Sequence, residues 1–387
     1  MRIIMPTFEE MKWMPPTISL IEQLAIMGHE VVYVTICPDE YYPHFDQKRV
    51  KNVALYSKKI STIDAVPNIR LIKSVAFRID NILKSVFGRR LDSWLEKNLA
   101  KDDLLWIVNE MTTLFGGSSF ANKYKDNYIF TIYELHENER RWKHAKVVAQ
   151  NASVVVVPEY NRAHIQKSYW SLRNVPFVLP NKPLVHPRTK NIPSCEQSAI
   201  EKLESLKKEG KKVILYMGGI GLERPLEQLI EAVLMIRDRF EFAILGRQSL
   251  YLDYLLQKYP NGFTYLGSAT VPDHLTIASY ADIGVLIYVP DLHGLNALYC
   301  APNKIFEYTG FGMPVITNDI PGLNYYIDKY HCGVTFDMNS KDNIINAINQ
   351  CSANYELYSK GAKKLYDDID ISKLISKILL LFKQKSH

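Results

Sequence analysis

The sequence predicts an α/β protein made of two doubly wound domains, each with a parallel sheet. Its 387 residues exceed one typical core and fit two domains of about 180 residues each. In both halves, short apolar runs alternate with helical patterns. Between the halves, the stretch 176–193 holds five prolines and no periodic segment, which is typical of a linker. We therefore expect domains 1–182 and 183–370 to face each other across a cleft, with ligand at the carboxyl ends of the strands.

The first half begins with strand, helix and strand at the spacing of a βαβ unit. Residues 2–6 are apolar, residues 16–28 have helical periodicity and end at a glycine, and residues 31–36 are rich in β-branched side chains. Further buried strands are expected at 104–108, 128–133 and 154–157.

The second half repeats this alternation almost without exception. A final amphipathic helix is expected over 371–383. The whole terminal segment 371–387 is expected to pack on the first domain. The strands are expected at 213–217, 242–245, 263–266, 283–288 and 314–317, and the helices at 225–239, from 250, at 274–281 and at 302–311.

The composition indicates a globular protein without a membrane span. The chain is 47% hydrophobic and 23% charged, and no apolar run approaches the roughly 20 residues that a span needs. The first residues are too short for a signal-peptide core. Five scattered cysteines, never in a C-x-x-C pair, suggest neither a disulfide framework nor a zinc site. We expect a cytoplasmic location.

The positive charge is concentrated in the first half. Residues 1–182 hold 25 Lys and Arg against 19 Asp and Glu, a net of +6, whereas residues 183–387 hold 22 of each. This asymmetry indicates an anionic partner for the first domain, either a phosphate-bearing acceptor or a lipid surface, and no nucleic acid. Ordinary scatter in a lysine-rich sequence is the alternative.

The segment 70–101 is the most basic part of that half, with eight basic and three acidic residues. Its apolar residues fall near helical spacing. One interpretation is an amphipathic helical pair on the anionic inner face of a membrane, close to a lipid-linked acceptor. The other is a core-packed helical excursion with solvated lysines.

A glycine-rich loop follows the first strand of the second domain. Gly218, Gly219 and Gly221 lie between that strand and the next helix, where backbone N–H groups can approach a phosphate and the helix start adds positive potential. Arg224 is placed to reach the same anion. Tight turns use glycine too, so this loop alone also fits a structural turn.

A second segment, 296–316, points to the same chemistry. Pro302 suits the first helical position, and Cys300 and Ala301 before it are poor caps, so the first N–H groups of the helix are left for a ligand. Lys304 adds a full charge there. Glu307, on the same helical face, can accept hydrogen bonds from vicinal hydroxyls such as those of a ribose. A surface pair of these two side chains, worth only about 0.2–0.5 kcal/mol, is the alternative.

Four segments of the second domain form a combination of motifs: Gly218-Gly-x-Gly-x-x-Arg-x-x-x-x-Leu-Ile230, Ala281-Asp-Ile-Gly284, Pro302-Asn-Lys-Ile-Phe-Glu-Tyr and Gly312-Met-Pro-Val-Ile316. Two segments of the first domain, 109–114 and 133–137, stand at the ends of its two central strands. Taken together, these segments resemble bacterial GT-B glycosyltransferases, most closely the retaining family-four-like (glycosyl transferases group 1) members.

The resemblance implies that the second domain binds a nucleotide-diphosphate sugar, UDP-linked or another, and that the first binds the acceptor. By position, Glu307 would hold the ribose, Arg224 and the glycine loop the diphosphate, and His136 the donor sugar. The implied donor site comprises Gly218, Gly219, Gly221, Arg224, Gly246, Arg247, Tyr299, Pro302, Asn303, Lys304 and Glu307. Two positions depart from the family: Tyr299 stands where many relatives have a glutamate, and Gly219 where they often have a basic residue.

Catalysis would stabilise the leaving diphosphate, through Arg224 and Lys304. No metal is then required, and Asp370 of the only D-x-D is expected to cap the last helix. Retention, which the resemblance implies, needs no strong base, because the leaving phosphate can take the acceptor proton. Glu110 and Glu137 are the candidate bases if the enzyme inverts.

His136 follows a core strand, where it either reaches substrate or serves only as a hydrogen-bonded structural residue.

The function expected is transfer of a sugar to a glycan or glycolipid acceptor in bacterial surface polysaccharide assembly. A catalytically silent homologue that acts as a binding or scaffold subunit is one alternative, which the departures at Tyr299 and Gly219 make conceivable. A nucleotide-sugar epimerase is another, although it would be expected to carry more carboxylates and histidines around the glycine loop.

Overall fold

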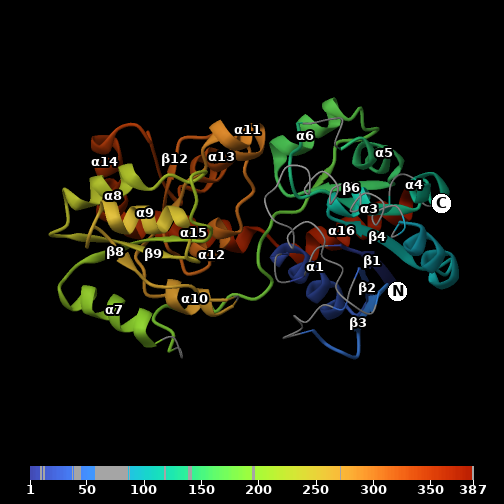
Figure 1. The fold of residues 1–387 in the computed structure, drawn as a ribbon, viewed down its shortest axis with the longest axis horizontal. Helices are drawn as coiled ribbons and strands as arrows, with labels where there is room; N and C mark the ends of the chain where they lie inside the picture. The colour runs from blue at the N-terminus through green and yellow to red at the C-terminus, as the bar shows by residue number, and fades with distance from the viewer. Residues whose placement is uncertain are drawn as a thin grey trace, which may run out of the picture. The chain divides into compact units, whose positions relative to one another are not determined.

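The protein consists of two compact α/β units. The computed structural model describes residues 1–385 except 9–10, 12–13, 37, 39–44, 57–85, 87, 117–118, 138–141, 194–196 and 271. One unit is Met1–Pro180 with Asp370–His387, and the other is Asn181–Ile369. Each has a parallel sheet with helices on both faces, so the predicted α/β class with two doubly wound halves is confirmed (Figure 1).

The sheet of the first unit has the strand order β3-β2-β1-β4-β5-β6-β7, with parallel pairs throughout. Its central strands are runs of Val, Ile, Leu and aromatic residues that are buried on both faces, as parallel strands require. The strands are β1 (Arg2–Pro6), β2 (Glu30–Thr35), β3 (Val50–Ala54), β4 (Leu104–Val108), β5 (Tyr128–Thr131), β6 (Val154–Val157) and β7 (Phe177–Val178).

Helices cover both faces of this sheet. On one face, α1 (Pro15–Ile26) and the last helix, α16 (Ile371–Lys385), share a hydrophobic core. Asp370 caps α16, since its carboxylate accepts a hydrogen bond from the N–H of Lys373 at 3.0 Å, as expected. The other face is covered by residues 88–98, α4 (Ser119–Lys123), α5 (Lys143–Asn151) and α6 (Tyr160–Tyr169), and α3 (Met111–Gly116) follows β4.

The second unit repeats the plan with the order β10-β9-β8-β11-β12-β13. Its strands are β8 (Lys212–Met217), β9 (Phe240–Leu245), β10 (Thr264–Tyr265), β11 (Ile283–Leu286), β12 (Val315–Asn318) and β13 (Gly333–Phe336). Helices α8 (Glu227–Leu234), α9 (Leu250–Lys258) and α14 (Lys341–Ala353) pack in one core. The other core contains α7 (Gln197–Lys208), α10 (Asp273–Ala278), α12 (Asn303–Thr309), α13 (Pro321–Tyr330) and α15 (Tyr355–Asp368), and α11 (Pro290–Leu298) precedes α12.

The glycine loop leaves β8 where the strand order reverses, because the next strand along the chain, β9, lies on one side of β8 and β11 lies on the other. In open parallel sheets, ligands bind beyond the carboxyl ends of the strands at such a point. The topology therefore places the glycine loop at the expected ligand position of the second unit.

Both boundaries of two predicted helices in the second unit were wrong. The helix expected at 225–239 spans Glu227–Leu234, because Pro225 and Leu226 precede it and residues 235–239 form turns before the buried Phe240. The helix expected at 302–311 begins at Asn303, since Pro302 has an extended ψ of 132° and is the N-cap instead of the first helical residue. It ends at Thr309, because turns follow through the left-handed Gly312 (φ +65°).

Only part of the basic segment 70–101 can be described. Residues 70–85 and 87 lie outside the described residues, whereas 88–98 are helical. Leu91 and Leu95 are each 1% exposed in the first unit's core, so this half of the segment packs inward. Within the described ranges, none of the helices combines the length and apolar character that a membrane span requires.

Candidate functional site

The glycine loop of the second unit lies directly against Lys304. Gly218 has a φ of +128°, which side chains rarely adopt. A methyl carbon at this position would lie 2.2 Å from Cε and 2.6 Å from Nζ of Lys304. The lysine stem can cross the loop only because Gly218 has no side chain.

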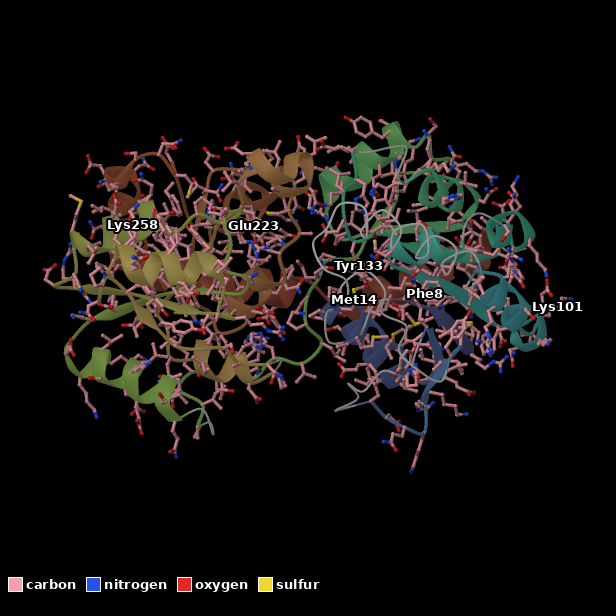
Figure 2. All side chains as sticks on the ribbon, in the orientation of Figure 1. Phe8, Met14, Lys101, Tyr133, Glu223 and Lys258 are labelled. Atoms are coloured by element: carbon pink, nitrogen blue, oxygen red, sulfur yellow. The ribbon has the colours of Figure 1, made fainter. Side chains whose placement is uncertain are left out.

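The neighbouring strand β9 also ends in a glycine at this point. A methyl carbon at Gly246 would lie 2.2 Å from the backbone oxygen of Gly218, so the two loops are in close contact. Arg247, the next residue, is exposed. Gly221 lies against the carboxylate of Glu223, a residue labelled in Figure 2. Two of the predicted donor-site glycines, Gly218 and Gly246, therefore meet.

Arg224 folds back over the loop. Its Nη1 donates to the carbonyl of Gly219 at a long 3.4 Å, and its guanidinium lies 5.1 Å from the ring centroid of Tyr288. Its Nε is buried and has no hydrogen-bond partner among the described residues. A buried, unsatisfied donor is costly without a partner, so Arg224 has unused capacity to bind an acceptor.

Helix α12 is held in place by Tyr308. The Tyr308 hydroxyl donates to the carbonyl of Leu215 at 3.0 Å and accepts from the N–H of Met217 at 3.1 Å, both in β8. Its ring lies on Gly284 of β11, where an added carbon would be 2.4 Å from Cγ. Because Lys304 and Glu307 are on the same helix, these contacts fix both side chains relative to the glycine loop.

Lys304 is a half-buried cation close to a second cation. Burial, and then the positive charge of Arg224, lower the pKa of Lys304 to about 8. No carboxylate forms a salt bridge with Lys304 in the part of the chain that the structure describes. Two positive groups held together without a bound acid are arranged for an anion.

Glu307 pairs with a histidine and not with Lys304. Its Oε1 lies 3.4 Å from Nε2 of His274, and both side chains are 14% exposed. Burial alone would raise the pKa of Glu307, but His274 and Lys304 hold it below its ordinary value. Burial would likewise lower the pKa of His274, yet the carboxylate raises it. The simple surface pair with Lys304 is therefore not formed.

His274, in α10, is a site residue that the sequence reasoning missed. Its Nδ1 is buried without a hydrogen-bond partner among the described residues. No local pattern links it to Glu307, because the two residues are far apart in the chain and meet only through the packing of α10 and α12 in one core.

His186, in the linker, is a second residue that the sequence did not single out. Its Nδ1 accepts from the N–H of Arg188 at 3.0 Å, so its proton is on Nε2, which donates to the backbone oxygen of Glu307 at 2.9 Å. Burial lowers the pKa of His186 to about 4. This neutral imidazole supports α12 from behind the site.

The remaining predicted donor residues surround the start of α12. Tyr299 is the half-buried C-cap of α11. Pro302 is the buried N-cap of α12, and no side chain caps the helix, as expected. Asn303 is half-buried in its first turn.

His136, Glu110 and Glu137 belong to the first unit. Nε2 of His136 lies 2.8 Å from Oε1 of Glu110, and its ring stacks on Trp142 at 3.7 Å. Glu110 is 2% exposed, whereas Glu137 is exposed. Tyr133, labelled in Figure 2, donates its backbone N–H to Oε2 of Glu110 at 2.9 Å. The structure therefore brings His136 and Glu110 into direct contact.

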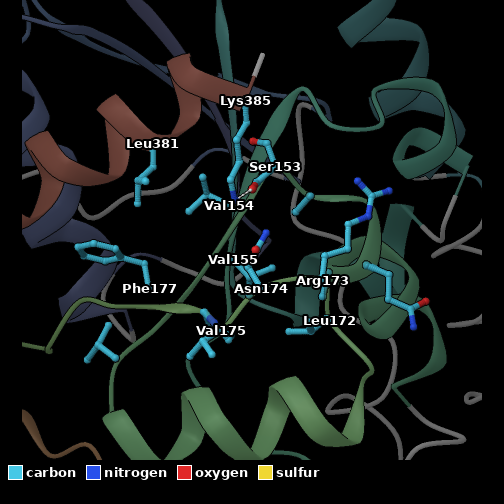
Figure 3. Close-up of a pocket in the computed structure, with 15 residues that line it drawn as sticks. Ser153, Val154, Val155, Leu172, Arg173, Asn174, Val175, Phe177, Leu381 and Lys385 are labelled. Atoms are coloured by element: carbon cyan, nitrogen blue, oxygen red, sulfur yellow. Dashed lines mark hydrogen bonds between the residues drawn. The ribbon is translucent and has the colours of Figure 1, made fainter. Parts of the chain in front are cut away.

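The first unit also has a hollow of about 250 Å³ beside β6 and β7 (Figure 3). Its lining includes Val154, Phe177 and Leu381, and Nζ of Lys385 donates to the backbone oxygen of Ser153 at 3.1 Å. Because Ser153 precedes β6, this hollow lies at the amino end of that strand and not at the carboxyl ends, where ligands of such sheets bind.

Among the described residues, no group of three or more His, Cys, Asp or Glu side chains is placed to hold an ion.

Known structures share this architecture over their whole length. Sucrose-phosphate synthase from Thermosynechococcus elongatus is 15% identical, with a TM-score of 0.68 over 99% of this chain and 98% of that one. HepE from Anabaena, in complex with UDP and glucose, is 13% identical, with a TM-score of 0.67 over 99% and 100%. WaaG, a glycosyltransferase involved in lipopolysaccharide biosynthesis, is 13% identical, with a TM-score of 0.62 over 98% of both chains. The fold is therefore GT-B, and no curated protein sequence matches the chain.

The family assignment comes from the second unit. Residues 198–367 match the family described as Glycosyl transferases group 1. This span includes the glycine loop, α10 and α12. The second unit thus matches the glycosyl transferases group 1 family, and the chain as a whole has the fold of GT-B glycosyltransferases.

Proposed function

We propose that the protein transfers a sugar, with retention, from a nucleoside diphosphate to a glycan or glycolipid acceptor in bacterial surface polysaccharide assembly. The donor occupies the second unit, and the acceptor binds to the first. Retention and the polysaccharide role rest on the resemblance to family-four-like enzymes. Supporting likenesses are HepE, whose structure contains UDP and glucose, and WaaG, which acts in lipopolysaccharide biosynthesis.

One observation carries the donor proposal: two cations converge on the glycine loop, and neither forms a salt bridge with a carboxylate among the described residues. The Lys304 stem lies on Gly218, and Arg224 contacts Gly219 while its Nε lacks a partner. A diphosphate would supply the missing charge and the missing acceptor together. It would also be the leaving group, so the same two cations would stabilise the charge that develops on it.

Glu307 would hold the ribose in this arrangement. Its pKa is held below the ordinary value, so the group is an ionised carboxylate with acceptor sites for two vicinal hydroxyls. His274 keeps that carboxylate charged and limits its rotation through the 3.4 Å contact. His136 would contact the donor sugar, and the exposed Glu137 remains the candidate base if the enzyme inverts.

The donor proposal is tested by thermal shift with UDP, GDP, ADP and dTDP, and with their sugars. A ligand that binds the folded state raises the melting temperature, by the equivalent of about 2.7 kcal/mol at 100 times Kd. We expect one nucleotide series to stabilise the wild type, and Arg224→Met and Lys304→Met to lose most of that shift. Lys258→Met, an exposed lysine of the same unit, is the matched control. Equal shifts in all four proteins would disprove the site.

The stereochemical outcome needs a separate measurement. Proton NMR of the first-formed product, or of the sugar released to water, reports its anomeric configuration. Retention predicts the configuration of the donor, and the opposite configuration would assign the enzyme to the inverting class. Slow release of nucleoside diphosphate from the sugar donor also separates an active enzyme from a silent binding homologue.

A further inference from the structure

The His136–Glu110 pair has a defined hydrogen-bond direction. Oε2 of Glu110 accepts from the backbone N–H of Tyr133 at 2.9 Å, because an amide nitrogen can only donate. Oε1 lies 2.8 Å from Nε2 of His136. A carboxyl group is a stronger acid than an imidazolium, so the shared proton belongs to the nitrogen and both carboxylate oxygens are acceptors.

The ring of His136 is fixed on one face and at one edge. It stacks on Trp142 with a centroid distance of 3.7 Å and an interplanar angle of 19°, and Trp142 is 4% exposed. His136 itself is 19% exposed, and its Nδ1 has no hydrogen bond within the described ranges. The stacking and the contact with Glu110 thus hold the ring, and its Nδ1 edge has no partner among the described residues.

The local sequence explains how a carboxylate comes to lie at the Nε2 edge of this ring. Asn109 has a φ of +68°, a conformation that asparagine tolerates better than most residues, and its side chain accepts from the N–H of Met111 at 2.9 Å. This turn at the end of β4 directs Glu110 toward the end of the neighbouring strand β5, where Tyr133 and His136 follow. At 2% exposure, Glu110 is too enclosed to act as a base on an acceptor itself.

We propose that Glu110 is a positioning residue, which holds the proton of His136 on Nε2 so that Nδ1 faces the bound substrate as a hydrogen-bond acceptor. The proposal deepens the proposed function and replaces the expectation that Glu110 serves as a base. A buried carboxylate that sets the tautomer and orientation of a histidine is a general device of catalytic sites. Substrate hydroxyls are the donors that such a nitrogen would recognise.

The tautomer of His136 is measured directly by NMR of protein with labelled histidine. The ring ¹⁵N and ¹³Cδ2 shifts distinguish the two neutral forms, and His136→Ala assigns the signal. We expect the Nε2–H form in the wild type. This experiment needs neither donor nor acceptor, so its outcome is independent of whether the donor has been identified. An Nδ1–H form in the wild type would overturn the proposal.

Glu110→Gln is the informative variant. Its single amide oxygen must serve the N–H of Tyr133, so its NH₂ faces Nε2 and moves the ring proton of His136 to Nδ1. We expect kcat for nucleoside diphosphate release to fall about 100-fold, a typical loss for a misplaced proton-bearing group, with KM for the donor unchanged. Glu241→Gln, which changes an equally buried carboxylate paired with Arg237, is the control with normal turnover and tautomer.

Unchanged kcat with the Nε2–H form retained in Glu110→Gln would refute the positioning role. If this variant does not fold, Glu110→Asp keeps both acceptor oxygens and should preserve the Nε2–H form. A purely structural role would lower stability in both variants without moving the tautomer.

Discussion

Donor affinity should fall as the pH rises above about 8, because Lys304 loses its ammonium charge there in the free protein. Burial and Arg224 lower its pKa, and a bound diphosphate would reverse the second effect by adding negative charge. The pKa of Lys304 is then higher in the complex than in the free site. Binding above the free-state pKa must therefore take up a proton, and binding well below it need not.

The size of the effect follows from the two pKa values. Full restoration of the ordinary lysine pKa of about 10.4 is the upper limit, because burial persists in the complex, and it corresponds to about two pKa units, or about 3 kcal/mol. At this limit, affinity should fall about fivefold from pH 8 to pH 9 and about sevenfold from pH 9 to pH 10. About half a proton should be taken up for each donor bound at pH 8, and about nine-tenths at pH 9.

Isothermal titration calorimetry with the nucleoside diphosphate found by thermal shift measures both quantities. Titrations at pH 7 and 9, each in two buffers with different ionisation enthalpies, give Kd and proton uptake. Lys304→Arg is the sharp control, because an arginine stays charged throughout this range, and its affinity should not follow the same pH dependence. A wild-type affinity that is flat from pH 7 to 9.5, or an uptake near zero at pH 9, would refute the placement of Lys304 at the diphosphate.

Three further predictions concern the same unit. Gly218→Ala should abolish donor binding, because the added carbon displaces the stem of Lys304. Gly210→Ala is the control: it has a φ of +78° and no atom within 4 Å of the added carbon, so it should lower stability by a similar amount and leave turnover intact. Equal turnover in the two variants would contradict this prediction. His274→Asn should weaken donor binding about tenfold, or about 1.4 kcal/mol, and should remove any loss of affinity that accompanies deprotonation of this imidazole. His164→Asn, at an exposed position, is the control. An unchanged Kd for His274→Asn would count against a role of His274 in holding Glu307. Tyr308→Phe should lower the free energy of unfolding by about 1–3 kcal/mol, because it leaves a buried N–H and a buried C=O of β8 without their partner. Urea denaturation measures this change, and an unchanged midpoint would show that these two hydrogen bonds contribute little.

The sheets were predictable because both are parallel and are covered by helices on both faces. Such strands are buried on both faces, and runs such as 104–108 and 154–157 are continuously apolar as a result. Helix ends were less predictable. Pro302 is compatible both with a first helical position and with an extended N-cap, and the sequence does not distinguish these, whereas in the structure its ψ is 132°.

The predicted donor residues that meet in the structure either follow strand ends or lie in α12. Gly218 and Gly246 come after β8 and β9, and Lys304 reaches the loop from α12. Local patterns locate such residues because parallel strands present their carboxyl ends at one edge. His274 and His186 could not be found this way, since each acts on Glu307 through tertiary packing and neither belongs to a motif.

The repulsion between Lys304 and Arg224 does not displace α12, because contacts remote from these two charges hold the helix in place. Placing Lys304 near Arg224 disfavours the charged form, as the lowered pKa shows. Tyr308 and His186 anchor the same short helix through hydrogen bonds to β8 and to the linker, so the backbone that carries Lys304 cannot shift away without breaking them. The interactions that resist the repulsion are thus separate from those that would bind the donor. Substitutions at Tyr308 should therefore act first on stability, and substitutions at Lys304 should act first on affinity.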